Sequence, residues 1–241
     1  MSTPNPSLTL LEPFRALMEF AFQQSSGPHQ SKHGDGHPVV IFPGLGADGT
    51  SVSILRTHCQ GLGYEAFDWG HGFNTGPRGE LDAWLEGLAD QLSLKLAEHA
   101  QPATLIGWSL GGLYARELAK LLAPGLRQVI TIATPFNASA DGQGSGWMAS
   151  VLGGNASSLD PKWIKRFRTP PPIRTTSIYS RSDGVVAWET CRHDKRSRLV
   201  QDIEVDGSHM GMGWNREVLN IVADRLGQQT DPWRPYVNLR S

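Results

Sequence analysis

Short apolar runs rich in β-branched residues alternate with helical patterns from Pro38 to Leu226, and this alternation restricts the fold more than any other feature of the chain. Such alternation is typical of βαβ units, in which a helix connects two parallel strands. The expected strands span residues 39–42, 64–69, 103–108, 127–133, 175–180 and 199–205, and the expected helices 10–22, 50–62, 80–99, 110–122 and 215–226. We therefore predict an α/β fold with a mostly parallel sheet of about six strands and helices on both faces.

Composition excludes several classes of protein. The 22 Lys and Arg residues nearly balance the 23 Asp and Glu residues, so the net charge of -1 provides no basic surface for nucleic acid or an anionic membrane. No run approaches the roughly 18 apolar residues that a membrane span needs.

The N-terminal apolar stretch Leu8–Leu11 is too short for a signal peptide. With Cys59 and Cys191 interpreted as free thiols, the sequence predicts a cytoplasmic protein without a stable membrane anchor. The oligomeric state stays open.

The chain length of 241 residues fits a single domain, which we assign to residues 1–241. Within it, residues 1–36 are expected to form an N-terminal helix and a linker. Residues 137–172 interrupt the regular pattern, are rich in Gly and Ser, and end in three prolines. Segments 147–152 and 161–167 within them could form short helices, the second with Asp160 as its N-cap. Long ordered loops of this kind are often lids, although a disordered surface loop is the alternative.

The segment Gly107-Trp108-Ser109-Leu110-Gly111 matches the pattern G-x-S-x-G. Five residues alone would be weak evidence, but here a predicted strand precedes the motif and a predicted helix follows it, as a nucleophile elbow requires. The tight turn lifts the Ser109 hydroxyl above the sheet and directs the Leu110 amide at a developing oxyanion. Ser109 is therefore the candidate nucleophile, and an inert serine in a tight turn is the alternative.

A serine hydroxyl needs a base to accept its proton, and in this arrangement the chain order is serine, acid, histidine. Only two of the eight histidines follow Ser109. His193 lies in a charged stretch that we interpret as solvated surface, whereas His209 lies in a glycine-flanked loop after the last strand. His209 is therefore the predicted base. Asp183 follows the fifth strand directly and is the predicted orienting acid, with Asp206 as the competitor that more plausibly stabilises a local turn.

A second oxyanion donor is expected from the loop after the first strand, Phe42–Asp48. Gly44 and Gly46 allow its backbone to approach a substrate, and the Leu45 amide is the best candidate donor. An ordinary glycine-rich turn is the alternative. A phosphate cradle is a weaker one, because the loop matches neither G-x-G-x-x-G nor the P-loop.

Taken together, the glycine loop, the G-x-S-x-G motif, Asp183-Gly184 and Ser208-His209 resemble bacterial lipases and esterases of the α/β-hydrolase superfamily. The resemblance extends from about Pro38 to Leu226 and implies that Ser109, Asp183 and His209 form a catalytic triad, with Leu45 and Leu110 as the oxyanion amides. Two departures stand out. Pro43 occupies the position where many such lipases have histidine, and the additional antiparallel strands with which the sheet of the family often begins are not found, which suggests a trimmed core.

Several aromatic residues could line an apolar acyl pocket, although each alone is more often part of the core. The candidates for substrate binding are Trp108, Phe136, Trp147 and Met210, and Trp69, Trp188 and Trp214 also lie near predicted strand ends. Segment 71–77 follows the second predicted strand and is expected near the pocket, where it would shape the acyl or alcohol site. A plain turn explains the segment equally well. His29, His33 and His37 are spaced by four, but glycines and a proline between and after them favour a flexible linker over a helical metal site.

These features predict hydrolysis of a carboxylic ester through an acyl-enzyme, with a small ester that has an apolar acyl group as substrate and without a metal or cofactor. Acyl transfer to an alcohol, amine or thiol would use the same residues. A catalytically silent α/β-hydrolase scaffold that only binds ligands is the alternative from another class, although every member of the triad is present.

Overall fold

Six parallel strands form one sheet in the order β2-β1-β3-β4-β5-β6. The computed structural model describes residues 4–24, 34–137, 160–195, 197–228 and 233–237. The strands are β1 (Pro38–Phe42), β2 (Glu65–Asp68), β3 (Ala103–Trp108), β4 (Leu126–Ile132), β5 (Arg174–Ser180) and β6 (Val200–Val205). The prediction of a mostly parallel sheet of about six strands is confirmed.

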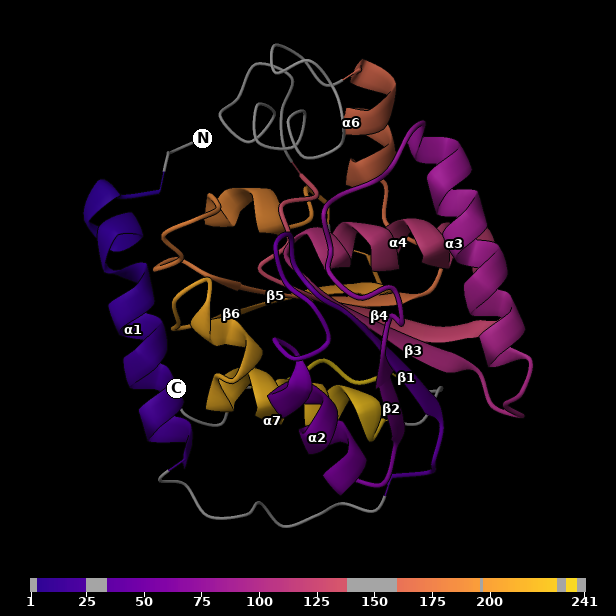
Figure 1. Cartoon of the computed structure of the whole chain (residues 1–241), viewed down its shortest axis with the longest axis horizontal. Coiled ribbons are helices and arrows are strands. Elements are labelled where there is room, and N and C mark those ends of the chain that lie inside the picture. The colour runs from indigo at the N-terminus through magenta and orange to yellow at the C-terminus, as the bar shows by residue number, and fades with distance from the viewer. Residues whose placement is uncertain (1–3, 25–33, 138–159, 196, 229–232, 238–241) are drawn as a thin grey trace.

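Helices cover both faces of the sheet, as predicted. Figure 1 shows α3 (Leu81–Leu96) and α4 (Leu110–Leu122) on one face, and α2 (Ser53–Gly61) and α7 (Arg216–Leu226) on the other. Each pair of helices belongs to its own buried apolar cluster. Because apolar side chains meet the sheet from both sides, every residue of the central strands β1 and β3 is buried.

Local capping explains where two helices begin. The N-terminal helix α1 (Pro6–Gln24) starts four residues earlier than predicted, because Asn5 Oδ1 accepts a hydrogen bond from the Ser7 amide at 3.0 Å and Pro6 takes the first helical position. Helix α2 starts later than predicted. Asp48 Oδ1 accepts the Thr50 amide at 2.9 Å, which forms a turn at the predicted start of the helix.

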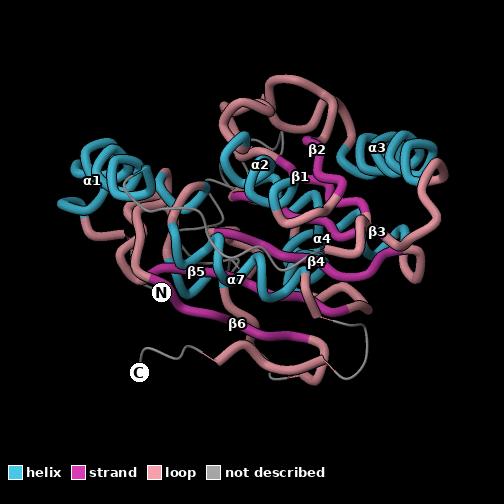
Figure 2. Tube along the Cα trace, turned by 90° about the horizontal axis from the view of Figure 1, so that it is seen from below, coloured by secondary structure: helices cyan, strands magenta, loops and turns pink. Residues whose placement is uncertain are grey.

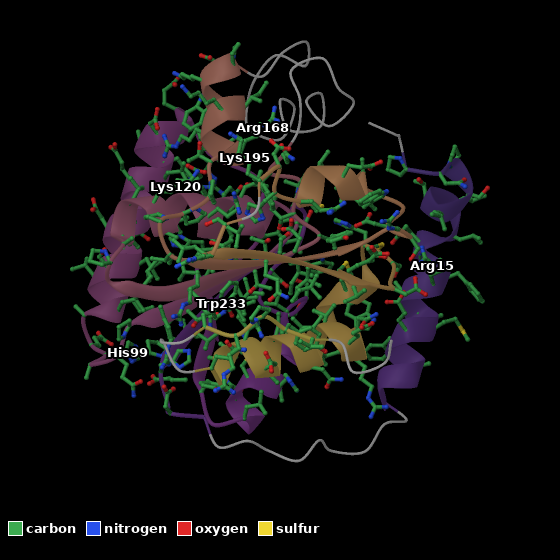
Figure 3. The ribbon with its side chains drawn as sticks, turned by 180° about the vertical axis from the view of Figure 1, so that it is seen from behind. Arg15, His99, Lys120, Arg168, Lys195 and Trp233 are labelled. Atoms are coloured by element: carbon green, nitrogen blue, oxygen red, sulfur yellow. The ribbon has the colours of Figure 1, made fainter. Side chains whose placement is uncertain are left out.

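The predicted insertion at 137–172 is described only in part. The proposed helix at 147–152 and Trp147 lie outside the described residues. The other predicted helix is present as α6 (Pro161–Arg168), where Asp160 Oδ1 accepts the Lys162 amide at 2.8 Å. It packs on α4 through an ion pair of Arg166 with buried Glu117, while Lys120 donates to the Arg166 carbonyl. Figure 3 labels Lys120 beside α6. The division into one domain with a lid stays a prediction.

Helix α1 lies at the end of the molecule opposite α3 in both views (Figures 1 and 2). It packs beside η2 (Gly211–Gly213), a short 3-10 helix that follows β6. A second 3-10 helix, η1 (Trp188–Cys191), follows β5. Over the described residues, no helix combines the length and apolar character needed to cross a bilayer.

Candidate active site

Ser109 occupies the turn between β3 and α4 with a strained backbone. Its φ of 53° and ψ of -122° belong to a region of backbone conformation that residues other than glycine rarely adopt. The Ser109 amide donates to the Ile132 carbonyl at 2.8 Å, and its carbonyl accepts the Gly112 amide at 3.0 Å. These bonds fix the turn at the carboxyl end of the sheet. A serine in such a turn between a strand and a helix presents its hydroxyl at the top of the sheet.

Three glycines allow the backbone to close around this turn. A Cβ added at Gly107 would collide with the backbone of Gly111 and Gly112. At Gly111 it would collide with the Phe42 carbonyl on β1, and at Gly112 with the Thr134 side chain. The requirement for small residues around Ser109 is therefore a matter of direct backbone contact.

Replacing Gly107 with alanine is expected to destabilise the protein by about 3 kcal/mol, because the backbone that meets the new methyl group cannot rotate away as a side chain would. Thermal unfolding should show a Tm lower by roughly 10 °C. Gly87→Ala is the matched control, since a Cβ there meets nothing within 4 Å and alanine favours helix α3 by up to about 1 kcal/mol. Equal Tm values for the two variants would contradict the packing argument.

His209 lies in the loop after β6 and connects the serine to a carboxylate. Its Nε2 is 3.1 Å from Ser109 Oγ, and its Nδ1 is 2.7 Å from Asp183 Oδ2. All three side chains are buried. A carboxylate can only accept, so Nδ1 carries the proton and Nε2 presents its lone pair to the serine hydroxyl. The arrangement can therefore take a proton from Ser109 and stabilise the imidazolium that results.

Asp183 is held in place by backbone amides. Its Oδ1 accepts hydrogen bonds from the amides of Val185 and Val186, both at 2.8 Å, which leaves Oδ2 for the imidazole. Asp206, the competing acid, accepts instead from the Ser182 hydroxyl, and its carbonyl accepts from Asn215 at 2.9 Å. Asp206 therefore serves the local turn, as its position in the sequence indicates.

The loop after β1 passes directly beside the serine. A Cβ added at Gly44 would lie 3.3 Å from Ser109 Cβ, so this backbone approaches the hydroxyl closely. Leu45 follows at the surface, 41% exposed, and Leu110 is the first residue of α4. Amides in the first turn of a helix have no partner within it. Both residues predicted as oxyanion donors thus flank Ser109 in space or in sequence.

Buried Asn74 fixes that loop, a role that the sequence pattern does not indicate. Its Nδ2 donates to the Pro43 carbonyl at 2.8 Å, its amide donates to the Ala47 carbonyl at 2.8 Å, and its carbonyl accepts the Gly46 amide at 2.8 Å. The sequence of segment 71–77 is consistent with either a pocket wall or a plain turn. The contacts of Asn74 show that it also supports the glycine loop.

The candidate pocket residues differ in their surroundings. Trp108 is buried, and its indole N–H donates to the His209 carbonyl at 3.2 Å, which supports the histidine loop. Phe136 is 1% exposed and lies under the Arg116 guanidinium, 3.7 Å from the ring centre. Met210 is 44% exposed and follows His209, so it is available to a substrate. Contact of these residues with substrate stays a prediction.

Two histidines lie in surroundings that the sequence did not predict. The interpretation of the stretch around His193 as solvated surface is wrong for its imidazole, which is 4% exposed, donates to Asp202 Oδ1 at 2.6 Å and accepts from Arg116 at 3.0 Å. His37, assigned to a linker, is fully buried and contacts Thr104 at 3.0 Å. His29 and His33 lie outside the described residues. Both imidazoles bond to residues other than Ser109, so neither takes the place of His209.

Burial lowers the pKa of His193 below its usual 6.5. The unfolded chain therefore binds a proton that the folded protein does not, and stability should fall as the pH drops through about 6.5 toward the lowered value. Thermal unfolding at about pH 8 and about pH 5 would measure this loss. His193→Gln keeps a donor for Asp202 and an acceptor for Arg116 but does not titrate, so its Tm should change less with pH. An unchanged pH dependence would contradict the assignment.

Comparisons with known proteins identify the family of the chain. A family model for the alpha/beta hydrolase family matches residues 33–238. A pimeloyl-[acyl-carrier protein] methyl ester esterase from Shewanella woodyi is 31% identical over 155 residues, which cover 59% of this chain and 56% of the relative. The chain therefore spans only about half the length of this curated relative.

Solved lipases have a similar fold. Lipase B from Aspergillus fumigatus matches with a TM-score of 0.60 at 16% identity, over 83% of this chain and 55% of the lipase. A lipase from Bacillus licheniformis matches with a TM-score of 0.59 at 16% identity, over 82% of this chain and 96% of the lipase. At this identity the likeness concerns the fold.

Proposed function

The chain belongs to the alpha/beta hydrolase family, and from this premise we propose that it is a serine hydrolase that cleaves carboxylic esters through an acyl-enzyme. The observation that carries the proposal is the continuous hydrogen-bonded series from Ser109 through His209 to Asp183, with distances of 3.1 Å and 2.7 Å. A fold alone does not determine an activity, but this geometry matches the requirements of nucleophilic catalysis by serine.

In the first half of the reaction, Ser109 Oγ attacks the ester carbonyl carbon while His209 Nε2 takes the hydroxyl proton. The amides of Leu45 and Leu110 donate to the oxyanion of the tetrahedral intermediate, assisted by the positive end of α4. When the intermediate collapses, the carbon–oxygen bond to the alcohol breaks and His209 returns the proton to the departing alkoxide. The product is an ester of the substrate acyl group with Ser109.

In the second half, His209 takes a proton from water, and the resulting hydroxide attacks the acyl-serine carbonyl. Collapse releases the carboxylic acid and restores the Ser109 hydroxyl with the proton held by His209. Asp183 stays ionised throughout and stabilises the imidazolium each time it forms. No step needs a metal or cofactor.

The substrate class follows from the surroundings of the serine. Met210 is an exposed apolar residue beside the base, which favours an apolar acyl group near Ser109. The curated relative from Shewanella woodyi is named as a methyl ester esterase, which supports an ester as substrate. Both cysteines are buried and free, and we propose a cytoplasmic location, where thiols stay reduced.

A panel of p-nitrophenyl esters from short to long acyl chains tests the proposal. We expect turnover that varies with acyl length, and labelling of Ser109 by an organophosphonate ester in a ratio of one label to one chain. An intact, folded protein that hydrolyses none of the esters and refuses the label would contradict it. Added alcohol, amine or thiol acceptors would distinguish acyl transfer, since a transferase would form the new ester, amide or thioester in preference to the free acid.

A further inference from the structure

The N-terminal helix α1 places a buried carboxylate against both catalytic loops. Glu12 is 2% exposed, although α1 lies at one edge of the molecule (Figure 1). We propose that Glu12, assisted by Glu19, is a positioning residue. It holds the Asp183 loop and the His209 loop in the relative position that the triad requires. This inference rests on the proposed function, because it concerns the same triad, and it assigns to α1 a role that the sequence pattern did not indicate.

The Glu12 carboxylate bridges the two loops directly. Its Oε1 accepts the Gly184 amide at 2.6 Å and the His209 amide at 3.1 Å. Its Oε2 accepts the Met210 amide at 3.2 Å. One side chain thus binds the residue after the acid, the base itself and the residue after the base. A fixed carboxylate between these amides restricts the separation of Asp183 from His209.

Other contacts of α1 hold the same two loops. Glu19, seven residues and about two turns from Glu12, accepts the Ser208 amide through Oε1 at 2.7 Å. Arg15, labelled on α1 in Figure 3, donates to the carbonyl and hydroxyl of Ser182 beside the acid. Thr9 donates to the Gly184 carbonyl at 2.5 Å. One face of the helix therefore binds the residues on either side of the acid and of the base.

The backbone of α1 approaches the Asp183 loop so closely that only glycine fits at position 184, and the Glu19 side chain lies equally close to position 211. A Cβ added at Gly184 would lie 2.6 Å from the Leu8 carbonyl carbon and oxygen. A Cβ added at Gly211 would collide with Glu19 Oε2. Helix α1 and the loops are thus in direct contact on both sides of the His209–Asp183 pair.

A purely structural reason for Glu12 is insufficient. Burying a carboxylate costs more than burying an apolar side chain even with a partner such as Arg15, whose Nη1 lies 3.8 Å from Glu12 Oε1, and apolar contacts can dock a helix without that cost. Helix α1 already has such contacts, since Phe20 packs edge-on against Trp214 with ring centres 5.9 Å apart. A carboxylate that accepts amides of two loops adds what apolar packing lacks, which is directional control of those loops.

The test is Glu12→Gln, which keeps the size of the side chain but presents an amide donor to one of the loop amides. If Glu12 positions the triad, kcat for p-nitrophenyl ester hydrolysis should fall by about tenfold to a hundredfold, as expected for small displacements of catalytic groups. KM should stay within about twofold of wild type, because the substrate contacts are unchanged. Glu12→Asp retains the charge and should recover part of kcat.

Phe20→Ala is the matched control, because it weakens the docking of α1 without removing a bond to either loop. We expect it to lower Tm at least as much as Glu12→Gln while kcat stays within about threefold of wild type. Equal kcat losses in the two variants, or a kcat for Glu12→Gln within about twofold of wild type, would overturn the proposal.

Backbone amide hydrogen exchange gives a readout that does not depend on turnover. In Glu12→Gln, the amides of Gly184, His209 and Met210 should exchange faster, while those of β4 stay as protected as in wild type. If wild type hydrolyses no ester, the proposed function fails and this exchange pattern still decides whether Glu12 holds the loops. Should Glu12→Gln not fold, Glu19→Gln is measured in the same way at Ser208, and unchanged exchange there would overturn the inference.

Discussion

Replacing Ser109 with alanine is expected to lower kcat for ester hydrolysis by about 10⁶-fold, the loss seen when a nucleophile is removed from a working triad. The hydroxyl at 3.1 Å from His209 Nε2 is the atom that would form the acyl-enzyme, and alanine removes only that oxygen. Because Cβ is retained, the strained φ of 53° is unaffected and stability should change little. Steady-state kinetics of ester hydrolysis measures kcat, and thermal unfolding of the same preparation measures the stability.

Ser93→Ala provides the control, since Ser93 lies on the exposed side of α3. It should hydrolyse esters and accept the organophosphonate label as wild type does, whereas Ser109→Ala should do neither. Retention of more than about one per cent of wild-type turnover by Ser109→Ala would assign the reaction to another nucleophile.

The sequence predicted the sheet well because its signals are local. Each predicted strand end lies within one residue of the observed end, since apolar β-rich runs are bounded by turn residues. The predicted helix 110–122 coincides with α4, because the glycines around Ser109 mark where β3 must turn. The proximity of Ser109, Asp183 and His209 could be predicted because all three follow parallel strands, whose carboxyl ends lie at the same edge of the sheet.

The sequence could not predict contacts made by distant partners. His193 lies among charged residues, and its burial depends on Arg116 from α4, which is 77 residues away in sequence. Glu12 likewise lies in a stretch for which the sequence predicts only a helix. Its partners are backbone amides 172 to 198 residues away, and such donors have no signature in side-chain patterns. The heptad spacing of Glu12 and Glu19 on an apolar helix was the one signal available.

Asp183→Asn is expected to lower kcat by about 10⁴-fold while the fold is retained. The reason lies in how the carboxylate is held. The amides of Val185 and Val186 both donate to Oδ1, so the asparagine carbonyl oxygen must take that position. The side-chain NH₂ group then faces His209 Nδ1 at the place where Oδ2 accepted its proton.

Two donors cannot face each other across 2.7 Å, so the imidazole of the variant adopts the tautomer with its proton on Nε2. That nitrogen then donates to Ser109 Oγ and cannot take the serine proton, which blocks the first step of the reaction. Asp206→Asn is the matched control, because Asp206 bonds to Ser182 and should keep kcat within about threefold of wild type. If the Asp206 variant lost more activity than the Asp183 variant, the assignment of the orienting acid would have to be reversed.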